Sequence, residues 1–175
     1  MLSKLHLLFL KFFVCKNIKF KNLKLPFYSK IKLRKNSHLF LGDNFRARGH
    51  LCINLANNAY LHIGNNCFFN NNCSINCHKN IFIGDNTILE ESILIYDHDH
   101  KFDYNTGAQT KGYNTAPVYI GNNCWIGSGT IILKGSYIED NCLIAAGSII
   151  NGKIKEKSLV YNQIKTIQIA NYSNI

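Results

Sequence analysis

Six isoleucines near the end of the chain recur at a constant spacing of six residues. This period matches neither the two-residue repeat of a strand nor the 3.6-residue repeat of a helix. The isoleucines are Ile120, Ile126, Ile132, Ile138, Ile144 and Ile150, and the small or slim residues two positions earlier are Val118, Cys124, Thr130, Ser136, Cys142 and Ser148. Two positions are therefore constrained together. A sustained six-residue apolar period predicts a parallel β-helix, in which each hexapeptide forms a short strand and a turn.

Turn signals rich in glycine and asparagine mark the expected coils, because these residues tolerate the positive φ of tight corners. They occupy residues 41–44, 63–66, 83–86, 120–123 and 138–141. Three intervals are close to 18 residues, which is one triangular turn of three hexapeptides, but the interval after residue 83 is twice as long. Within it, residues 101–117 are polar, aromatic and glycine-containing, and they show no six-residue rhythm. We expect a loop that leaves the coil here, and long loops in compact domains are usually functional.

These patterns divide the chain into an N-terminal segment (1–38), a β-helix (39–150) with the loop 101–117, and a C-terminal tail (151–175). Both end segments are expected to cap the coil, as solenoids require. The first fifteen residues are apolar, but Lys11 interrupts them and the run is too short to span a bilayer. We expect this segment to pack beside the core, and the lysines that follow it also allow contact with a membrane surface.

The net charge of +10 favours an anionic partner, such as a nucleotide, nucleic acid or lipid head group, without choosing among them. The seven cysteines are more informative by position than by number. Cys67, Cys73, Cys124 and Cys142 all stand two residues before a repeated apolar position, which predicts small buried core residues. Their spacing does not suggest a zinc site, so no metal is expected, and a reducing, cytoplasmic setting is favoured.

A polar segment, Tyr96-Asp97-His98-Asp99-His100, leads directly into the loop. On a strand the two histidines would share one face and the two aspartates the other. Such a segment could bind a metal, supply a general base with an orienting partner, or be a polar loop entrance without chemistry. Taken alone, the residues leave the catalytic and the structural interpretation open.

The hexapeptides, the stretch Asn122-Asn123-Cys124-Trp125-Ile126-Gly127 and the stretch Ile144-Ala145-Ala146-Gly147-Ser148 resemble the left-handed β-helix acyltransferases. Over about residues 38–165 the chain is most similar to the sugar O-acetyltransferases of polysaccharide biosynthesis, and more distantly to galactoside and maltose acetyltransferases. The resemblance implies an all-β, left-handed hexapeptide-repeat coil, a homotrimer with sites between subunits, and acetyl-CoA as the donor substrate.

The resemblance also implies roles for particular residues. His100 matches the family's catalytic base, and Asp97, Asp99 or a backbone carbonyl would hold its other ring nitrogen. Asn70 matches an acceptor-contacting asparagine, and His98 is expected to face the substrate. The coenzyme A thioester would contact four residues, and a backbone N–H near residues 125–128 would meet the oxyanion. These four are Trp125, Ser128, Ala146 and Lys153.

The function expected from these residues is acetyl-CoA-dependent O-acetylation of a sugar hydroxyl on a surface polysaccharide, a glycolipid or its precursor. The enzyme is expected in the cytoplasm or at the inner face of the membrane, without a nucleic-acid partner. One alternative is N-acetylation of an amino sugar nucleotide. Two others belong to different classes: a metal enzyme of the γ-type carbonic anhydrase kind, using His78, His98 and His100, and a non-catalytic β-helix scaffold.

Overall fold

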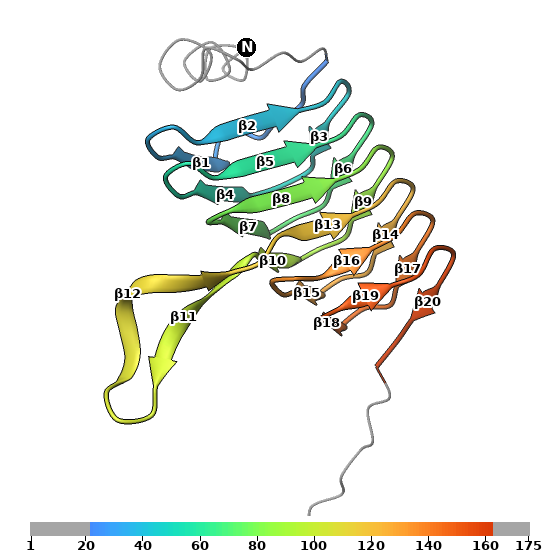
Figure 1. Cartoon of the computed structure of the whole chain (residues 1–175). Helices are drawn as coiled ribbons and strands as arrows, with labels where there is room; N and C mark the ends of the chain where they lie inside the picture. The colour runs from blue at the N-terminus through green and yellow to red at the C-terminus, as the bar shows by residue number, and fades with distance from the viewer. Residues whose placement is uncertain (1–21, 163–175) are drawn as a thin grey trace, which may run out of the picture.

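The computed structural model describes residues 22–162, and this part of the chain consists of twenty short β-strands joined by turns (Figure 1). In chain order they are β1 (Lys30–Leu33), β2 (His38–Leu41), β3 (Arg46–Ala47), β4 (Leu51–Leu55), β5 (Tyr60–Ile63), β6 (Phe68–Phe69), β7 (Cys73–Cys77), β8 (Asn80–Ile83), β9 (Ile88–Leu89), β10 (Leu94–Tyr96), β11 (His98–Asp103), β12 (Gly107–Thr115), β13 (Val118–Ile120), β14 (Trp125–Ile126), β15 (Ile131–Ile132), β16 (Tyr137–Ile138), β17 (Leu143–Ile144), β18 (Ile149–Ile150), β19 (Lys153–Ile154) and β20 (Leu159–Val160).

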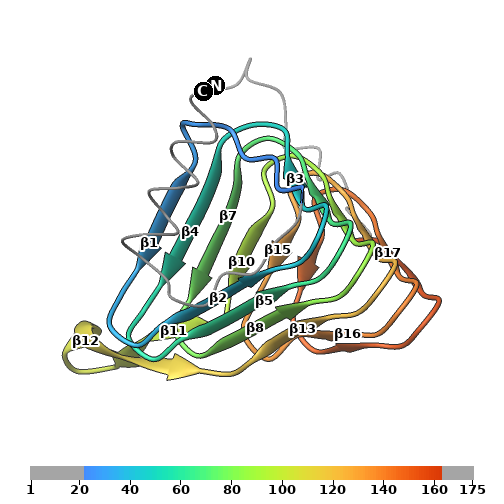
Figure 2. The ribbon, with the colours of Figure 1, turned by 90° about the horizontal axis from the view of Figure 1, so that it is seen from above.

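Three six-stranded sheets contain all of these strands except β11 and β12. Sheet 1 is ordered β1-β4-β7-β10-β15-β18, sheet 2 is ordered β2-β5-β8-β13-β16-β19, and sheet 3 is ordered β3-β6-β9-β14-β17-β20. The chain visits sheets 1, 2 and 3 in rotation, so it winds as a triangular coil of parallel strands. Seen from the N-terminal end, the chain runs counterclockwise as it recedes, which makes the coil left-handed, as the resemblance implied (Figure 2).

The six regularly spaced isoleucines form the core of the C-terminal turns of the coil. Ile120 pairs in register with Ile138, and the same alignment repeats in the other two sheets. All six isoleucines are at most 3% exposed. Complete burial of each such side chain contributes about 1.5–3 kcal/mol of transfer free energy, so stacked repeats stabilise one another. The four cysteines expected in the core are also buried, which confirms that prediction.

Asparagine and glycine hold the corner between sheets 2 and 3 for different reasons. Asn44, Asn66, Asn86, Asn123 and Asn141 all adopt positive φ, and their side-chain amides form a continuous hydrogen-bonded ladder. The glycines of the same corner have ordinary φ. A Cβ on Gly84 would lie 2.7 Å from the backbone carbon of Gly121 in the next turn. The prediction of positive φ therefore holds for asparagine, whereas the glycines permit close approach of successive turns.

The predicted loop leaves the coil between β10 and β13 and forms an antiparallel hairpin of β11 and β12 (Figure 1). His98 aligns with Thr115 and His100 with Tyr113, and an irregularity follows His100. At the tip, the carboxylate of Asp103 accepts hydrogen bonds from the N–H groups of Asn105 and Thr106 at 2.9 Å. The expected excursion is thus an ordered arm that begins at His98, earlier than the predicted residue 101.

Coil strands extend into both segments that the sequence assigned to capping. β1 begins at Lys30, before the expected boundary at residue 39, and β20 ends at Val160, after the boundary at residue 150. Weak sequence periodicity hid these outer strands. The apolar N-terminal run and the end of the tail lie outside the described residues. No helix within residues 22–162 is long and apolar enough to cross a membrane.

Candidate active site

Histidines gather where sheet 1 turns into sheet 2, a region that we call the histidine corner. His78 follows β7, and Asp97 and His98 follow β10 in the next turn of the coil. The imidazoles of His78 and His98 are stacked, with centroids 3.6 Å apart and planes inclined by 12°. Burial lowers the pKa of His78, the neighbouring His98 lowers it further, and Asp97 partly opposes both effects. The lowered pKa of His78 favours its neutral form in this stack.

Asp97 anchors the histidine corner from inside the coil. Its side chain is completely buried. Its Oδ1 accepts a hydrogen bond from the His78 N–H at 2.7 Å, and its Oδ2 accepts one from the Lys79 N–H at 2.6 Å. Nδ1 of His98 lies 3.2 Å from Oδ1. Asp97 therefore joins two turns of the coil and contacts His98.

His100 lies on the exposed part of the hairpin. Its Nδ1 is 3.0 Å from the backbone carbonyl oxygen of Gln109 on β12. When Nδ1 carries the proton, that contact leaves Nε2 unprotonated and able to accept a proton. Of the partners that the sequence left open for His100, neither aspartate is used. Asp97 contacts His98, and Asp99 pairs with Lys134 at 2.9 Å.

Tyr113 joins the three histidines. Its ring lies edge-on to His78 and His98, with centroids 4.2 Å and 5.2 Å away, and 4.8 Å from His100 at a tilted angle. The histidines therefore line one aromatic cluster. Among residues 22–162, no group of three or more His, Cys, Asp or Glu side chains is placed to hold a metal ion.

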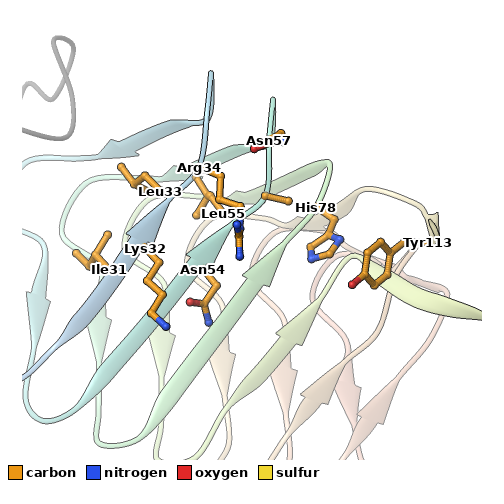
Figure 3. A pocket seen from close by; sticks show the side chains of 10 residues that line it. Ile31, Lys32, Leu33, Arg34, Asn54, Leu55, Asn57, His78 and Tyr113 are labelled. Atoms are coloured by element: carbon orange, nitrogen blue, oxygen red, sulfur yellow. The ribbon is translucent and has the colours of Figure 1, made fainter. Parts of the chain in front are cut away.

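A groove of about 920 Å³ opens beside this cluster (Figure 3). Figure 3 shows Lys32 toward one end of the groove, Arg34 and Asn54 near its middle, and His78 beside Tyr113 at the other end. Strands β1 and β4 provide much of the lining, so the groove runs along the first three turns of the coil. The apolar residues Leu33 and Leu55 also line it.

A second group of predicted site residues lies at the corner between sheets 3 and 1, which we call the Glu90 corner. Asn70 follows β6 there and is 7% exposed. Its Nδ2 donates a hydrogen bond to Glu90 Oε2 at 3.0 Å, and Nε1 of Trp125 donates one to Glu90 Oε1 at 3.2 Å. Glu90 thus joins the predicted acceptor-binding residue to a predicted cofactor-binding residue. Trp125 is 51% exposed, so its ring is accessible to a ligand.

Ser128 and Ala146 occupy the same corner in later turns, because they follow β14 and β17. The Gly147 N–H donates to the Ser128 carbonyl at 2.8 Å, which stacks these two turns. Lys153 instead begins β19 on sheet 2, where its ammonium lies 2.8 Å from Glu139 and 5.4 Å from the centre of the Tyr137 ring. The structure therefore brings Trp125, Ser128 and Ala146 to one edge and places Lys153 on another face.

The two corners are separated within one chain. Strand β7 connects them, with Asn70 before it and His78 after it. At about 3.3 Å per residue, its five residues separate the corners by roughly 16 Å. His100 and the Glu90 corner consequently belong to different edges of the triangle. A single chain does not assemble all the predicted site residues at one point.

Several residues of this region escaped the sequence interpretation. Glu90, Gln109 and Tyr113 were not selected, and His78 was considered only as a metal ligand. Hexapeptide phase could have placed Glu90 on the same corner as Asn70 one turn later. No comparable signal exists for Gln109 or Tyr113, because their positions depend on the register of the hairpin.

Comparison with known proteins agrees with this architecture. The family described as bacterial transferase hexapeptide (six repeats) matches residues 117–152. WbbJ of Escherichia coli K12, named as a lipopolysaccharide biosynthesis O-acetyl transferase, is 23% identical over 136 residues, covering 73% of this chain and 69% of WbbJ. A maltose O-acetyltransferase structure from Clostridium difficile 630 is 37% identical, with a TM-score of 0.51, covering 57% of this chain and 52% of that one.

The hexapeptide-repeat acetyltransferase VCA0836 of Vibrio cholerae, solved with acetyl coenzyme A, is 25% identical with a TM-score of 0.54. That match covers 65% of this chain and 64% of VCA0836, so the chain spans only about half to two thirds of the two solved proteins. The left-handed coil and these matches make the chain similar to hexapeptide-repeat acetyltransferases over the lengths that they cover.

Proposed function

We propose that this protein transfers an acetyl group from acetyl-CoA to a hydroxyl group of a sugar in a surface polysaccharide, a glycolipid or its precursor. The observation that carries the proposal is the histidine cluster at the base of an ordered hairpin, where the rhythm of the coil breaks. The named activities of WbbJ and the maltose O-acetyltransferase support a sugar hydroxyl as acceptor, and the VCA0836 complex supports acetyl-CoA as donor.

We assign the general base to His100. A sugar hydroxyl is a poor nucleophile at neutral pH, so a neutral imidazole must take its proton as the oxygen attacks the thioester carbonyl carbon. The Gln109 carbonyl orients the ring of His100 and leaves Nε2 for this task. Collapse of the tetrahedral intermediate then breaks the C–S bond, and the imidazolium returns the proton to the departing thiolate of coenzyme A.

His98 is the second candidate for the base, and one observation favours it. The Asp97 carboxylate lies 3.2 Å from its Nδ1, which is the partner arrangement that stabilises an imidazolium. The His98 side chain is only 12% exposed, however, and it is stacked against His78. The greater accessibility of His100 is the reason for preferring it, with His98 facing the acceptor.

The separation of the two corners supports a homotrimer in this proposal. Coenzyme A would lie along Trp125, Ser128 and Ala146 of one copy and meet His100 of a neighbouring copy. The N–H groups of Trp125 and Gly127 already donate to carbonyls of the next turn. Among the described residues, the Ser128 N–H has no hydrogen-bond acceptor, so it is the remaining donor for the oxyanion in that turn.

Lys153 would contact a phosphate of coenzyme A only after exchanging its pairing with Glu139, which raises the pKa of the lysine. The same proposal includes a cytoplasmic enzyme with peripheral membrane contact through the N-terminal segment. The proposed membrane contact concerns residues outside 22–162.

The test is release of free thiol from acetyl-CoA with a panel of neutral sugars, amino sugars and oligosaccharides. Wild type is expected to acetylate at least one hydroxyl, and His100→Ala to lose at least a hundredfold in kcat/KM. His98→Ala is expected to raise KM for the acceptor more than it lowers kcat. A larger kcat loss in His98→Ala than in His100→Ala would transfer the base to His98. Acetylation confined to amino groups would favour the N-acetyltransferase alternative.

A further inference from the structure

The groove beside the histidine corner carries unbalanced positive charge. Lys32 and Arg34 line it, and neither pairs with a carboxylate within the described part of the chain. No Asp or Glu is among the described residues that line the groove. The remaining polar lining includes Asn54 and His78. Two cations two residues apart, lining a concave surface without a carboxylate, favour an anion there.

The chemistry of these side chains favours a phosphate over a single carboxylate. Arginine offers a planar fork of N–H donors that fits two phosphate oxygens, and lysine adds a compact charge. Figure 3 shows Arg34 between Lys32 and His78 along the groove. A phosphate or diphosphate carries enough negative charge to neutralise both Lys32 and Arg34.

The position of the groove connects it with the acceptor. His78 and Tyr113 line its far end, and the same two rings contact His98, while Tyr113 also contacts His100. The groove lies along the first three turns of the coil, whereas the residues proposed for coenzyme A lie in the last three. A ligand held by Lys32 and Arg34 would therefore extend along the groove to the histidines.

We propose that the acceptor sugar carries a phosphate or diphosphate group, and that Lys32 and Arg34 bind this group while the sugar lies against His78 and Tyr113. The inference rests on the proposed acetyltransferase function for the name "acceptor", but the anion site itself does not depend on it. A sugar linked to a nucleotide and a sugar linked to a lipid diphosphate share this chemistry.

The experiment measures binding of inorganic diphosphate by calorimetry to the full chain saturated with coenzyme A, which keeps the cofactor site filled. The test variant is the double substitution Lys32→Ala and Arg34→Ala. Lys30→Ala is the matched control, because Lys30 lies on the same exposed side of β1 but does not line the groove. We expect the double variant to bind diphosphate at least tenfold more weakly than wild type and Lys30→Ala to bind it like wild type.

Three results would overturn the proposal. The first is absence of diphosphate binding to wild type at millimolar concentration, and the second is an equal loss of binding in the double variant and in Lys30→Ala. The third is diphosphate binding that appears only when coenzyme A is left out. Further arms compare inorganic diphosphate with uridine diphosphate and farnesyl diphosphate. Tighter binding of the nucleotide supports a nucleotide-linked acceptor, and tighter binding of the isoprenoid supports a lipid-linked one. Because binding needs no turnover, a missing acetyl transfer would count against the proposed function and leave this site intact.

Discussion

Replacing Asp97 with alanine provides a direct test of how the histidine corner is held together. The Asp97 side chain is completely buried and accepts hydrogen bonds from two backbone N–H groups, those of His78 and Lys79. It also contacts His98. Alanine removes both acceptors, and the two N–H groups belong to part-buried hydrogen bonds.

The expected cost follows from these two bonds. A fully buried donor left without an acceptor costs about 1–3 kcal/mol, so two of them would cost about 2–6 kcal/mol in the free energy of unfolding; because these two bonds are part-buried, we expect a loss in the lower half of that range. Even the middle of that range would be large for a single substitution. The loss of the Asp97 contact should also free the His98 ring, so acceptor binding should weaken in any variant that still folds.

The assay is chemical denaturation at fixed protein concentration, with the transition followed by circular dichroism. Asp103→Ala is the control, since Asp103 also accepts two backbone N–H bonds but does so at the exposed hairpin tip. It should change the free energy of unfolding by less than about 0.5 kcal/mol, because water replaces the carboxylate. If Asp97→Ala proved as stable as Asp103→Ala, the argument from buried donors would be refuted.

Three further outcomes are expected. Burial raises the pKa of three core thiols to about 11, so iodoacetamide at pH 8 should leave them unmodified in the folded protein and label them after denaturation; they are Cys67, Cys73 and Cys124. The pKa of His78 is lowered below its ordinary value of 6.5, so the unfolded chain binds a proton at this residue more readily than the folded chain does. The free energy of unfolding is therefore fully retained only above pH 6.5. Denaturation between pH 8 and 5 should therefore show stability falling as pH falls through 6.5, less steeply in His78→Gln. Trp125 is the single tryptophan, so coenzyme A should change the fluorescence of wild type, and Trp125→Ala should bind coenzyme A several-fold more weakly by calorimetry; unchanged fluorescence at saturation would contradict its placement beside the cofactor.

Much of the fold could be predicted from the sequence because a solenoid repeats one local rule. The spacing of the isoleucines predicts parallel strands in register, and Ile126 does pair with Ile144 one turn later. The rule weakens at the ends, where a strand has a neighbour on one side only and needs less regular packing. That is why β1 and β20 were missed.

The candidate site was predictable in position but not in its internal contacts. The break after His100 located it, since a chain that leaves the coil must lose the six-residue rhythm. The partners of the histidines depend on which residues face each other across turns and across the hairpin. The Asp97 side chain points into the coil, where it contacts His98 and the backbone of the preceding turn. Gln109 contacts His100 from the opposite strand of the hairpin.

The sequence by itself determined the coil, its core and the place where the coil is interrupted, because each depends on residues at a fixed separation along the chain. Only the tertiary structure decided which side chains meet: Glu90 between Asn70 and Trp125, Tyr113 against three imidazoles, and Lys32 with Arg34 in one groove. Asn70 and Glu90 do lie one coil turn apart, but the contacts of Tyr113 depend on the register of the hairpin, which follows no repeat. All these contacts arise from stacking successive turns at about 4.8 Å and folding one hairpin back on itself, and no local pattern encodes those distances.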